Sequence, residues 1–186
     1  MDRITTPTYV ENCFTSEEIQ EILNLQNVFE LTPSKVIGNH VFDYRVSENF
    51  WIPKNDHKYK WIYDRLLKYI TIANKTYNFN LSMINDDIQF SIYRSTQNGN
   101  YSWHDDIISN NNFNTIRKLS LSVQLSNEDE YEGGELEIVS APENFIAPKK
   151  KGTIILFPSF LVHRVKPVTK GNRISLVLWI DGPPFK

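Results

Sequence analysis

The stretch HRVKPVTKGNRISLVLW, residues 163–179, decides the fold and opens with one of the chain's four histidines. Pro167 and Gly171 are turn residues, and alternating apolar and polar residues follow them. This pattern predicts a hairpin in which a strand starting at Arg173 runs beside the strand that carries His163. The stretch therefore indicates antiparallel β structure towards the end of the chain.

Side chains on that last strand alternate between two faces. One face is apolar and is expected to pack in the core, and it consists of Ile174, Leu176, Leu178 and Ile180. The other face carries Arg173, Ser175, Val177 and Trp179. A buried, unpaired guanidinium is costly, so Arg173 needs an anion. Two partners remain open: an acidic side chain in a structural salt bridge, or the carboxylate of a small molecule held by the guanidinium fork.

A second stretch, YSWHDDI at residues 101–107, places a histidine beside two aspartates. On a strand, His104 and Asp106 point to one side and Asp105 to the other. One imidazole and one carboxylate are two thirds of a facial triad that binds non-haem Fe(II); a hydrogen-bonded pair at a strand end is the alternative. The missing ligand is one of the other three histidines, and we interpret His40 and His57 as surface or packing residues. His163 remains as the candidate.

The rest of the chain places these stretches in one fold. A capping box at Thr15–Glu18 predicts the start of a helix over about residues 16–25. An apolar stripe predicts a second helix, which begins near Asn55 or Asp56 and includes Ala73. Short β-branched and aromatic segments follow, near 88–93, 101–106, 119–125, 135–138, 153–157, 163–165 and 173–180. The fold class is therefore α+β, mainly β: a sandwich or barrel backed by N-terminal helices.

Length and composition limit the remaining possibilities. The chain has 186 residues, which fits a single domain, with residues 1–80 as a helical support region and 81–186 as a β core. A net charge of −2 gives no strong attraction to nucleic acid or to an anionic membrane. Cys13 is the only cysteine, which suits a reducing compartment. No signal peptide or membrane-spanning run is evident, so we expect a soluble, cytoplasmic protein.

Four blocks of sequence together resemble the Fe(II)/2-oxoglutarate-dependent dioxygenases, in particular their prolyl 4-hydroxylase-like branch. The blocks are Tyr101–Asp106, Leu119–Leu125, Tyr131–Leu136 and His163–Trp179. The cation at position 173 is Arg rather than the Lys of collagen-type enzymes, and with the run YEGGEL it more closely resembles the PKHD-type hydroxylases of bacteria and phages. The resemblance implies a double-stranded β-helix, a jelly-roll or cupin-like barrel, with a metal between two sheets.

The resemblance also implies a role for each site residue. His104, Asp106 and His163 correspond to the iron ligands, and Arg173 to the residue that holds the distal carboxylate of 2-oxoglutarate. Tyr93 and Ser175 correspond to further 2-oxoglutarate contacts, and Tyr101 and Trp179 to aromatic residues of the substrate pocket. Tyr101 stands on the opposite alternation from His104, so it reaches the pocket only if the strand twists or bulges.

We therefore expect an oxygenase that uses Fe(II), 2-oxoglutarate and O2, with ascorbate as a reductant, and hydroxylates a prolyl residue of a peptide or protein. Succinate and CO2 would be the co-products. A free amino acid, another small molecule or a nucleobase are alternative substrates, and a non-catalytic binding module on the same barrel is an alternative function. The loop at residues 108–115 is either a lid over the substrate or an inert solvated loop.

Overall fold

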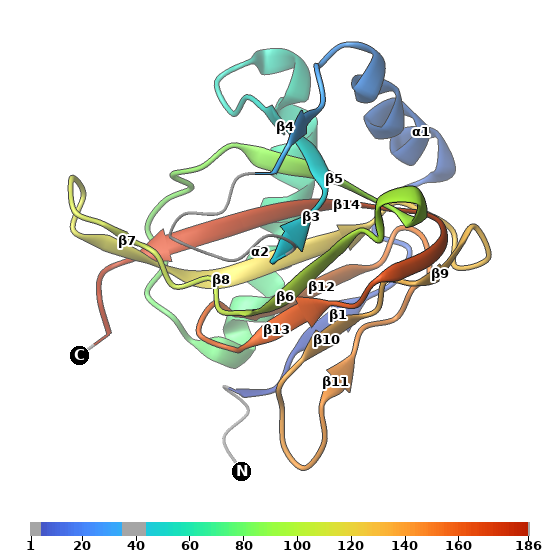
Figure 1. Cartoon of the computed structure of the whole chain (residues 1–186). Coiled ribbons are helices and arrows are strands. Elements are labelled where there is room, and N and C mark those ends of the chain that lie inside the picture. Colours follow the sequence, from blue (N-terminus) through green and yellow to red (C-terminus); the bar gives the residue numbers. More distant parts are fainter. Residues whose placement is uncertain (1–4, 35–43, 186) are drawn as a thin grey trace.

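The computed structural model describes residues 5–34 and 44–185, which form two facing β-sheets with two helices outside them (Figure 1). The major sheet has the order β1 (Thr8–Val10), β12 (Ile154–Pro158), β8 (Thr115–Gln124), β14 (Val168–Gly182), β5 (Ile88–Arg94), β4 (Glu48–Ile52), β2 (Thr32–Pro33). The short strands β7 (Ser109–Asn110) and β9 (Tyr131–Gly133) pair with β8 and β14.

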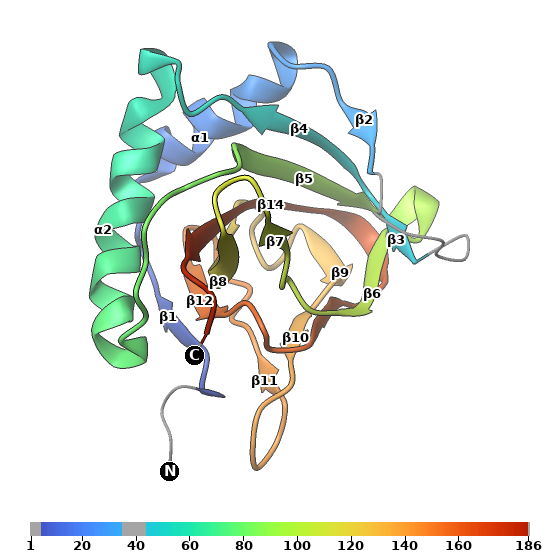
Figure 2. The same cartoon turned by 90° about the vertical axis from the view of Figure 1, so that its left-hand side faces the viewer.

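The minor sheet faces the middle of the major sheet and closes the barrel (Figure 2). Its order is β11 (Phe145–Ile146), β10 (Leu136–Ile138), β13 (His163–Val165), β6 (Asn100–His104), β3 (Arg45–Val46). All pairings in both sheets are antiparallel. The expected mainly β architecture, a double-stranded β-helix backed by helices, is confirmed.

The two helices lie on the outer side of the major sheet (Figure 2). Helix α1 (Ser16–Asn24) begins at the predicted capping box, in which the Thr15 side chain accepts from the Glu18 amide and the Glu18 carboxylate accepts from the Thr15 amide. The 3-10 helix η2 (Leu25–Asn27) extends it. Helix α2 (Lys60–Tyr77) starts later than predicted, because Asp56 caps the 3-10 helix η3 (His57–Tyr59) that precedes it. The 3-10 helix η4 (Ser95–Gln97) follows β5.

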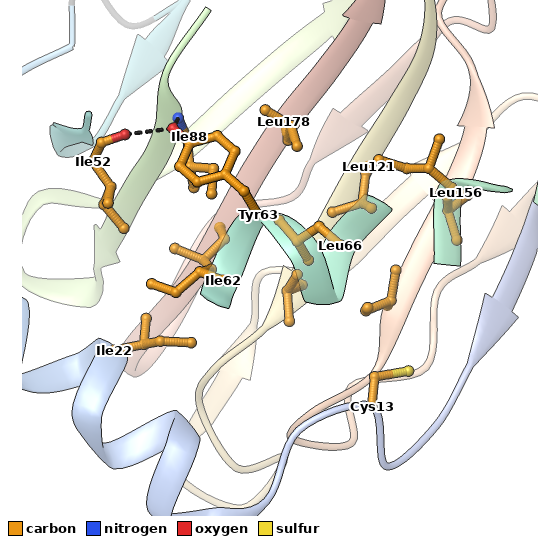
Figure 3. Packing of buried hydrophobic residues seen from close by; sticks show 14 of the residues in the cluster. Cys13, Ile22, Ile52, Ile62, Tyr63, Leu66, Ile88, Leu121, Leu156 and Leu178 are labelled. Carbon is orange, nitrogen blue, oxygen red and sulfur yellow. Dashed lines mark hydrogen bonds between the residues drawn. The ribbon is translucent and has the colours of Figure 1, made fainter. Parts of the chain in front are cut away.

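The larger apolar core fills the space between the helices and the major sheet (Figure 3). Ile62 and Leu66 of α2 pack in one cluster with Leu121 of β8 and Leu178 of β14. The buried hydroxyl of Tyr63 accepts from the Ile88 amide at 2.8 Å and donates to the Ile52 carbonyl at 2.6 Å. These two bonds join α2 to the start of β5 and to the end of β4. The predicted apolar face of the last strand therefore points to the helices, as expected, and its other face points into the barrel.

One sequence prediction of topology is wrong. The strands that carry His163 and Arg173 do not form a hairpin: β13 lies between β10 and β6 in the minor sheet, and β14 lies between β8 and β5 in the major sheet. Residues 168–171 pair instead with β9, where Gly133 and Gly171 adopt positive φ and a Cβ on either would collide with a backbone carbonyl. His163 and Arg173 consequently face the same interior from opposite sheets.

Among the described residues, no helix is long and apolar enough to cross a bilayer.

Candidate metal centre and adjoining pockets

Two histidines and one aspartate meet inside the barrel mouth. His104 ends β6, Asp106 follows two residues later, and His163 begins β13, directly opposite His104 in the antiparallel pairing. One potential ligand atom of each lies within 4.8 Å of the other two. Asp105 is not part of this cluster: it is exposed, and its carboxylate accepts from the Ile107 amide. The structure thus brings together the three residues that the sequence singled out.

Backbone carbonyls fix the direction of both imidazoles. Nδ1 of His104 lies 2.8 Å from the carbonyl of Ser102, and Nδ1 of His163 lies 2.9 Å from that of Leu161. A carbonyl accepts only, so each Nδ1 carries a proton and each Nε2 is the nitrogen left to bind a metal. Nε2 lies 3.9 Å from the Asp106 carboxylate for His104 and 3.5 Å for His163. This is the orientation that metal-binding histidines adopt.

A buried pair of serines holds Asp106. Its Oδ2 accepts from the Ser120 hydroxyl at 2.7 Å, and Ser120 in turn lies 2.9 Å from the hydroxyl of Ser159. The Asp106 amide donates to the Ser159 carbonyl at 2.8 Å. The chain just before His163 therefore positions Asp106 as well, and one oxygen of the carboxylate has a fixed partner while the other faces His104.

The electrostatics of this cluster favour the metal-binding forms of His104 and Asp106. Burial, reinforced by His163, lowers the pKa of His104 to about 4, so this imidazole is neutral near neutral pH. Burial also pushes the pKa of Asp106 upwards, but His163, His104 and the Ser120 hydroxyl outweigh it and bring that pKa below its usual range. Two imidazoles and one carboxylate, with open space beside them, fit a non-haem Fe(II) site.

Beyond the triad lies an inner pocket with Arg173 in its wall. Arg173 is 2% exposed, and its Nη1 donates to the Ser175 hydroxyl at 3.1 Å while its guanidinium lies 5.4 Å from the centre of the Tyr93 ring. Its Nε has no hydrogen-bond partner, and none of the carboxylates in the part of the chain described pairs with it. The salt-bridge alternative left open by the sequence therefore finds no acidic residue here.

Tyr101 reaches the site through a β-bulge. Between β13 and β6, His163 pairs with His104 but Val165 pairs with Tyr101, so β6 uses one extra residue and its alternation shifts. The ring of Tyr101 consequently stacks on the imidazole of His104, with ring centres 3.5 Å apart. Trp179 faces the same opening, and its side chain also helps to lower the pKa of Asp106.

An outer groove leads from the triad to the surface. His104, Asp106, Tyr101 and Trp179 line both this groove and the inner pocket. Its remaining wall includes two aromatic residues, Tyr44 and Trp51, two cationic residues, Arg45 and Arg117, and one acidic residue, Asp105. Ile108 lines it too, at the base of the β7–β8 turn, so part of the predicted loop borders the groove.

Sequence reasoning missed several residues of this region. Arg45 enters it because β3 pairs with β6, with Arg45 opposite Tyr101, and a two-residue strand leaves no periodic signal. Ser120 shares the inward face of β8 and was detectable only as a polar residue in an apolar strand. Of the rejected histidines, His57 is exposed in η3, and His40 lies outside the described residues.

Comparisons with known proteins agree with this geometry. The family model described as the 2OG-Fe(II) oxygenase superfamily matches residues 88–181, half of the chain. A PKHD-type hydroxylase of Teredinibacter turnerae is 36% identical over 50% of this chain and 42% of its own length. One from Aliarcobacter butzleri is 28% identical over 93% of this chain and 77% of its own length. Several of these relatives are thus matched over less than half of their length.

Solved structures show the same fold. A prolyl-4-hydroxylase of Pseudomonas putida superposes with a TM-score of 0.74 at 17% identity, over 97% of this chain and 94% of its own. A prolyl hydroxylase from Trichoplax adhaerens, in complex with a peptide fragment of a hypoxia inducible factor oxygen degradation domain, gives 0.76 at 18% identity, over 95% and 83%.

Proposed function

Since this chain belongs to the 2OG-Fe(II) oxygenase superfamily, we propose that it hydroxylates an unactivated C–H bond of a peptide or protein, and that the target is a prolyl residue. In this proposal His104, Asp106 and His163 bind Fe(II). Arg173 binds the distal carboxylate of 2-oxoglutarate. The similarity to PKHD-type hydroxylases, and to the fold of prolyl hydroxylases, supports the choice of reaction and target.

The observation that carries the proposal is the buried guanidinium of Arg173. A cation that is 2% exposed and has no carboxylate partner among the residues described is costly unless a ligand supplies the anion. The inner pocket joins it to the triad, so a dicarboxylate could reach both. Tyr93 and Ser175 flank the guanidinium and would help to orient that carboxylate.

The outer groove supports a peptide as the substrate. Its aromatic residues, Tyr101 and Trp179, border the triad, and flat apolar rings suit the side chain of proline. Burial raises the pKa of Tyr101 to about 12, so its hydroxyl stays neutral and can donate to a peptide carbonyl. A groove that continues past Trp51 to the surface accommodates the residues on either side of the target.

When bound, the metal and 2-oxoglutarate supply the oxidation: one atom of O2 enters the substrate and the other enters succinate, with release of CO2. The chain's own part is to orient and to exclude water. His104 and His163 present their Nε2 atoms on one side, Asp106 is fixed by Ser120, and the aromatic wall would hold the target carbon beside them.

The test is Fe(II)-dependent release of succinate from 2-oxoglutarate, with peptides screened by mass spectrometry for a gain of one oxygen. We expect release by the native protein and none by His104→Ala. If the native protein binds neither Fe(II) nor 2-oxoglutarate in an anaerobic titration, the proposal fails. If it releases succinate but oxidises only free amino acids or nucleobases, the chemistry stands and the peptide target is wrong.

The expected cytoplasmic location and the organisation as a single domain belong to the same proposal. Residues 1–80, expected to be a helical support region, also supply β1, β2, β3 and β4 to the two sheets. The single cysteine supports a reducing compartment.

A further inference from the structure

Arg45 lies one aromatic ring away from the metal centre. Its guanidinium lies 4.7 Å from the centre of the Tyr101 ring, and that ring stacks on His104. Arg45 also lines both the outer groove and the inner pocket. A substrate that places its reacting carbon beside the triad therefore brings its neighbouring residues within reach of this cation, since an extended chain advances about 3.3–3.6 Å per residue.

Arg45 retains hydrogen-bonding capacity. Its Nε donates to the Ser47 hydroxyl at 3.0 Å and its Nη2 reaches the Ser91 hydroxyl at 3.4 Å, both neutral partners. No carboxylate of residues 5–34 or 44–185 forms an ion pair with it, whereas Arg94 has Glu48 and Arg117 has Asp86. A guanidinium has five N–H donors, so most of those on Arg45 remain available.

In the proposed complex with Fe(II) and 2-oxoglutarate, the charges around the triad and Arg173 cancel without Arg45. The metal dication and the Arg173 guanidinium balance the Asp106 carboxylate and the dianionic 2-oxoglutarate. In the outer groove Arg117 pairs with Asp86, and Asp105 lines the wall but forms no ion pair with Arg45. A substrate carboxylate in this partly desolvated groove would be attracted to Arg45 more strongly than in water. Ser47, Ser91 and the Tyr101 ring hold the planar guanidinium of Arg45 in place, which favours binding of a planar anion.

We propose that Arg45 is a specificity-determining residue that binds a carboxylate carried by the substrate one or two residues from the target. This inference rests on the proposed function and adds a substrate class to it: peptides with an acidic residue near the hydroxylated position. The carboxylate has two possible sources, an Asp or Glu side chain or the free end of a short peptide or amino acid, and the experiment separates them.

The probes are capped synthetic peptides with a central proline whose flanking residue is Glu, Gln or Lys, and an uncapped Gln peptide that ends beside the proline. Binding is measured by fluorescence anisotropy with Mn(II) and 2-oxoglutarate present and oxygen excluded. We expect the native protein to bind the Glu peptide on the order of tenfold more tightly than the capped Gln peptide, as a charge-assisted hydrogen bond would give. High salt should reduce this preference.

Arg45→Gln should abolish the preference, and Arg45→Lys should keep part of it, because the charge remains and the fork is lost. Arg164→Gln is the matched control: Arg164 also stacks on an aromatic residue of β6, Trp103 at 4.4 Å, but lines neither cavity, so the preference should persist. Affinity for 2-oxoglutarate should be the same in Arg45→Gln and the native protein.

A preference for the uncapped peptide alone would support the same site with a terminal carboxylate as its ligand. Equal affinity of the native protein for all peptides, including no affinity for any, would overturn the inference, as would a Glu preference that survives in both Arg45 variants. A loss of 2-oxoglutarate affinity in Arg45→Gln without a change in peptide preference would assign Arg45 to the co-substrate instead. Failure of the proposed function is recognised separately, because the native protein would then release no succinate.

Discussion

Replacing Arg173 by Met separates a ligand-binding cation from a structural one. The side chain is 2% exposed, and Met is unbranched and uncharged and fills a similar space. The variant removes one buried charge, and it also removes the donor to Ser175, whose hydroxyl lies 3.1 Å away. If the guanidinium exists to bind 2-oxoglutarate, its loss should harm binding and leave the ligand-free fold intact or improved.

The typical free-energy cost of a buried charge gives the expected changes in stability and in 2-oxoglutarate affinity. Replacing buried ionic groups by apolar residues of similar volume is often neutral or stabilising by about 1–4 kcal/mol. In a chain of this size, each 1 kcal/mol corresponds to roughly 2–4 °C in Tm. Losing one partner of a buried, hydrogen-bonded charge pair costs about 2–5 kcal/mol of binding, which would raise the Kd for 2-oxoglutarate by roughly 30- to 5000-fold.

Thermal unfolding with Mn(II), with and without 2-oxoglutarate and under exclusion of oxygen, measures both effects. At about 100 times its Kd the ligand should stabilise the native protein by ~2.7 kcal/mol, a shift of roughly 5–10 °C, and at the same concentration it should leave Arg173→Met almost unshifted. The reasoning is refuted if Arg173→Met loses several kcal/mol of stability and keeps the full ligand-induced shift. That result would make Arg173 a structural residue.

Three further predictions concern the metal ligands and the core. Ser120→Ala should weaken Fe(II) binding by about 10–100-fold, because it removes the hydrogen-bond partner of a metal ligand. Ser122→Ala, on the same face of β8, is the control and should not weaken binding. An anaerobic metal titration measures both, and equal effects would contradict the role of Ser120. Asp105→Ala should retain the metal and Asp106→Ala should lose it, and the reverse result in the same titration would exclude the alternation argument. Leu66→Ala should cost about 2–5 kcal/mol in denaturant unfolding, because Leu66 is fully buried between α2 and the major sheet; a loss below 1 kcal/mol would show that this cluster is not tightly packed.

The sequence predicted those features that depend on alternation within one strand. Arg173 and Ser175 face the interior because they are two residues apart on β14. The predicted strand at 101–106 ends at His104, and Asp106 reaches the same cluster from the following segment, where its amide donates to the Ser159 carbonyl. The capping box likewise marks the start of α1 from four consecutive residues. Each of these signals is local, so no knowledge of the partner strands was needed.

Features that depend on pairing between distant strands were not predictable in this way. The turn residues Pro167 and Gly171 suggested a hairpin, but in this barrel the chain passes from one sheet to the other at that point, and β9 takes the pairing position instead. The bulge that turns Tyr101 inward is a mismatch between β6 and β13, which neither strand's sequence reveals alone. Arg45 reaches the site through the same β6, from a strand of two residues.

The division of the site between two sheets has a consequence for how it is held together. The strands that carry His104 and His163 belong to the minor sheet, whereas Tyr93, Arg173 and Ser175 are on β5 and β14 of the major sheet. The distance between the triad and the Arg173 guanidinium is therefore set by the packing between the sheets. A second apolar cluster fills that space, with Leu136 and Val165 from the minor sheet against Phe157 from the major one. Because such interiors are close-packed, this cluster fixes the spacing between the triad and Arg173, which in the proposed function is the spacing that a bound dicarboxylate must span.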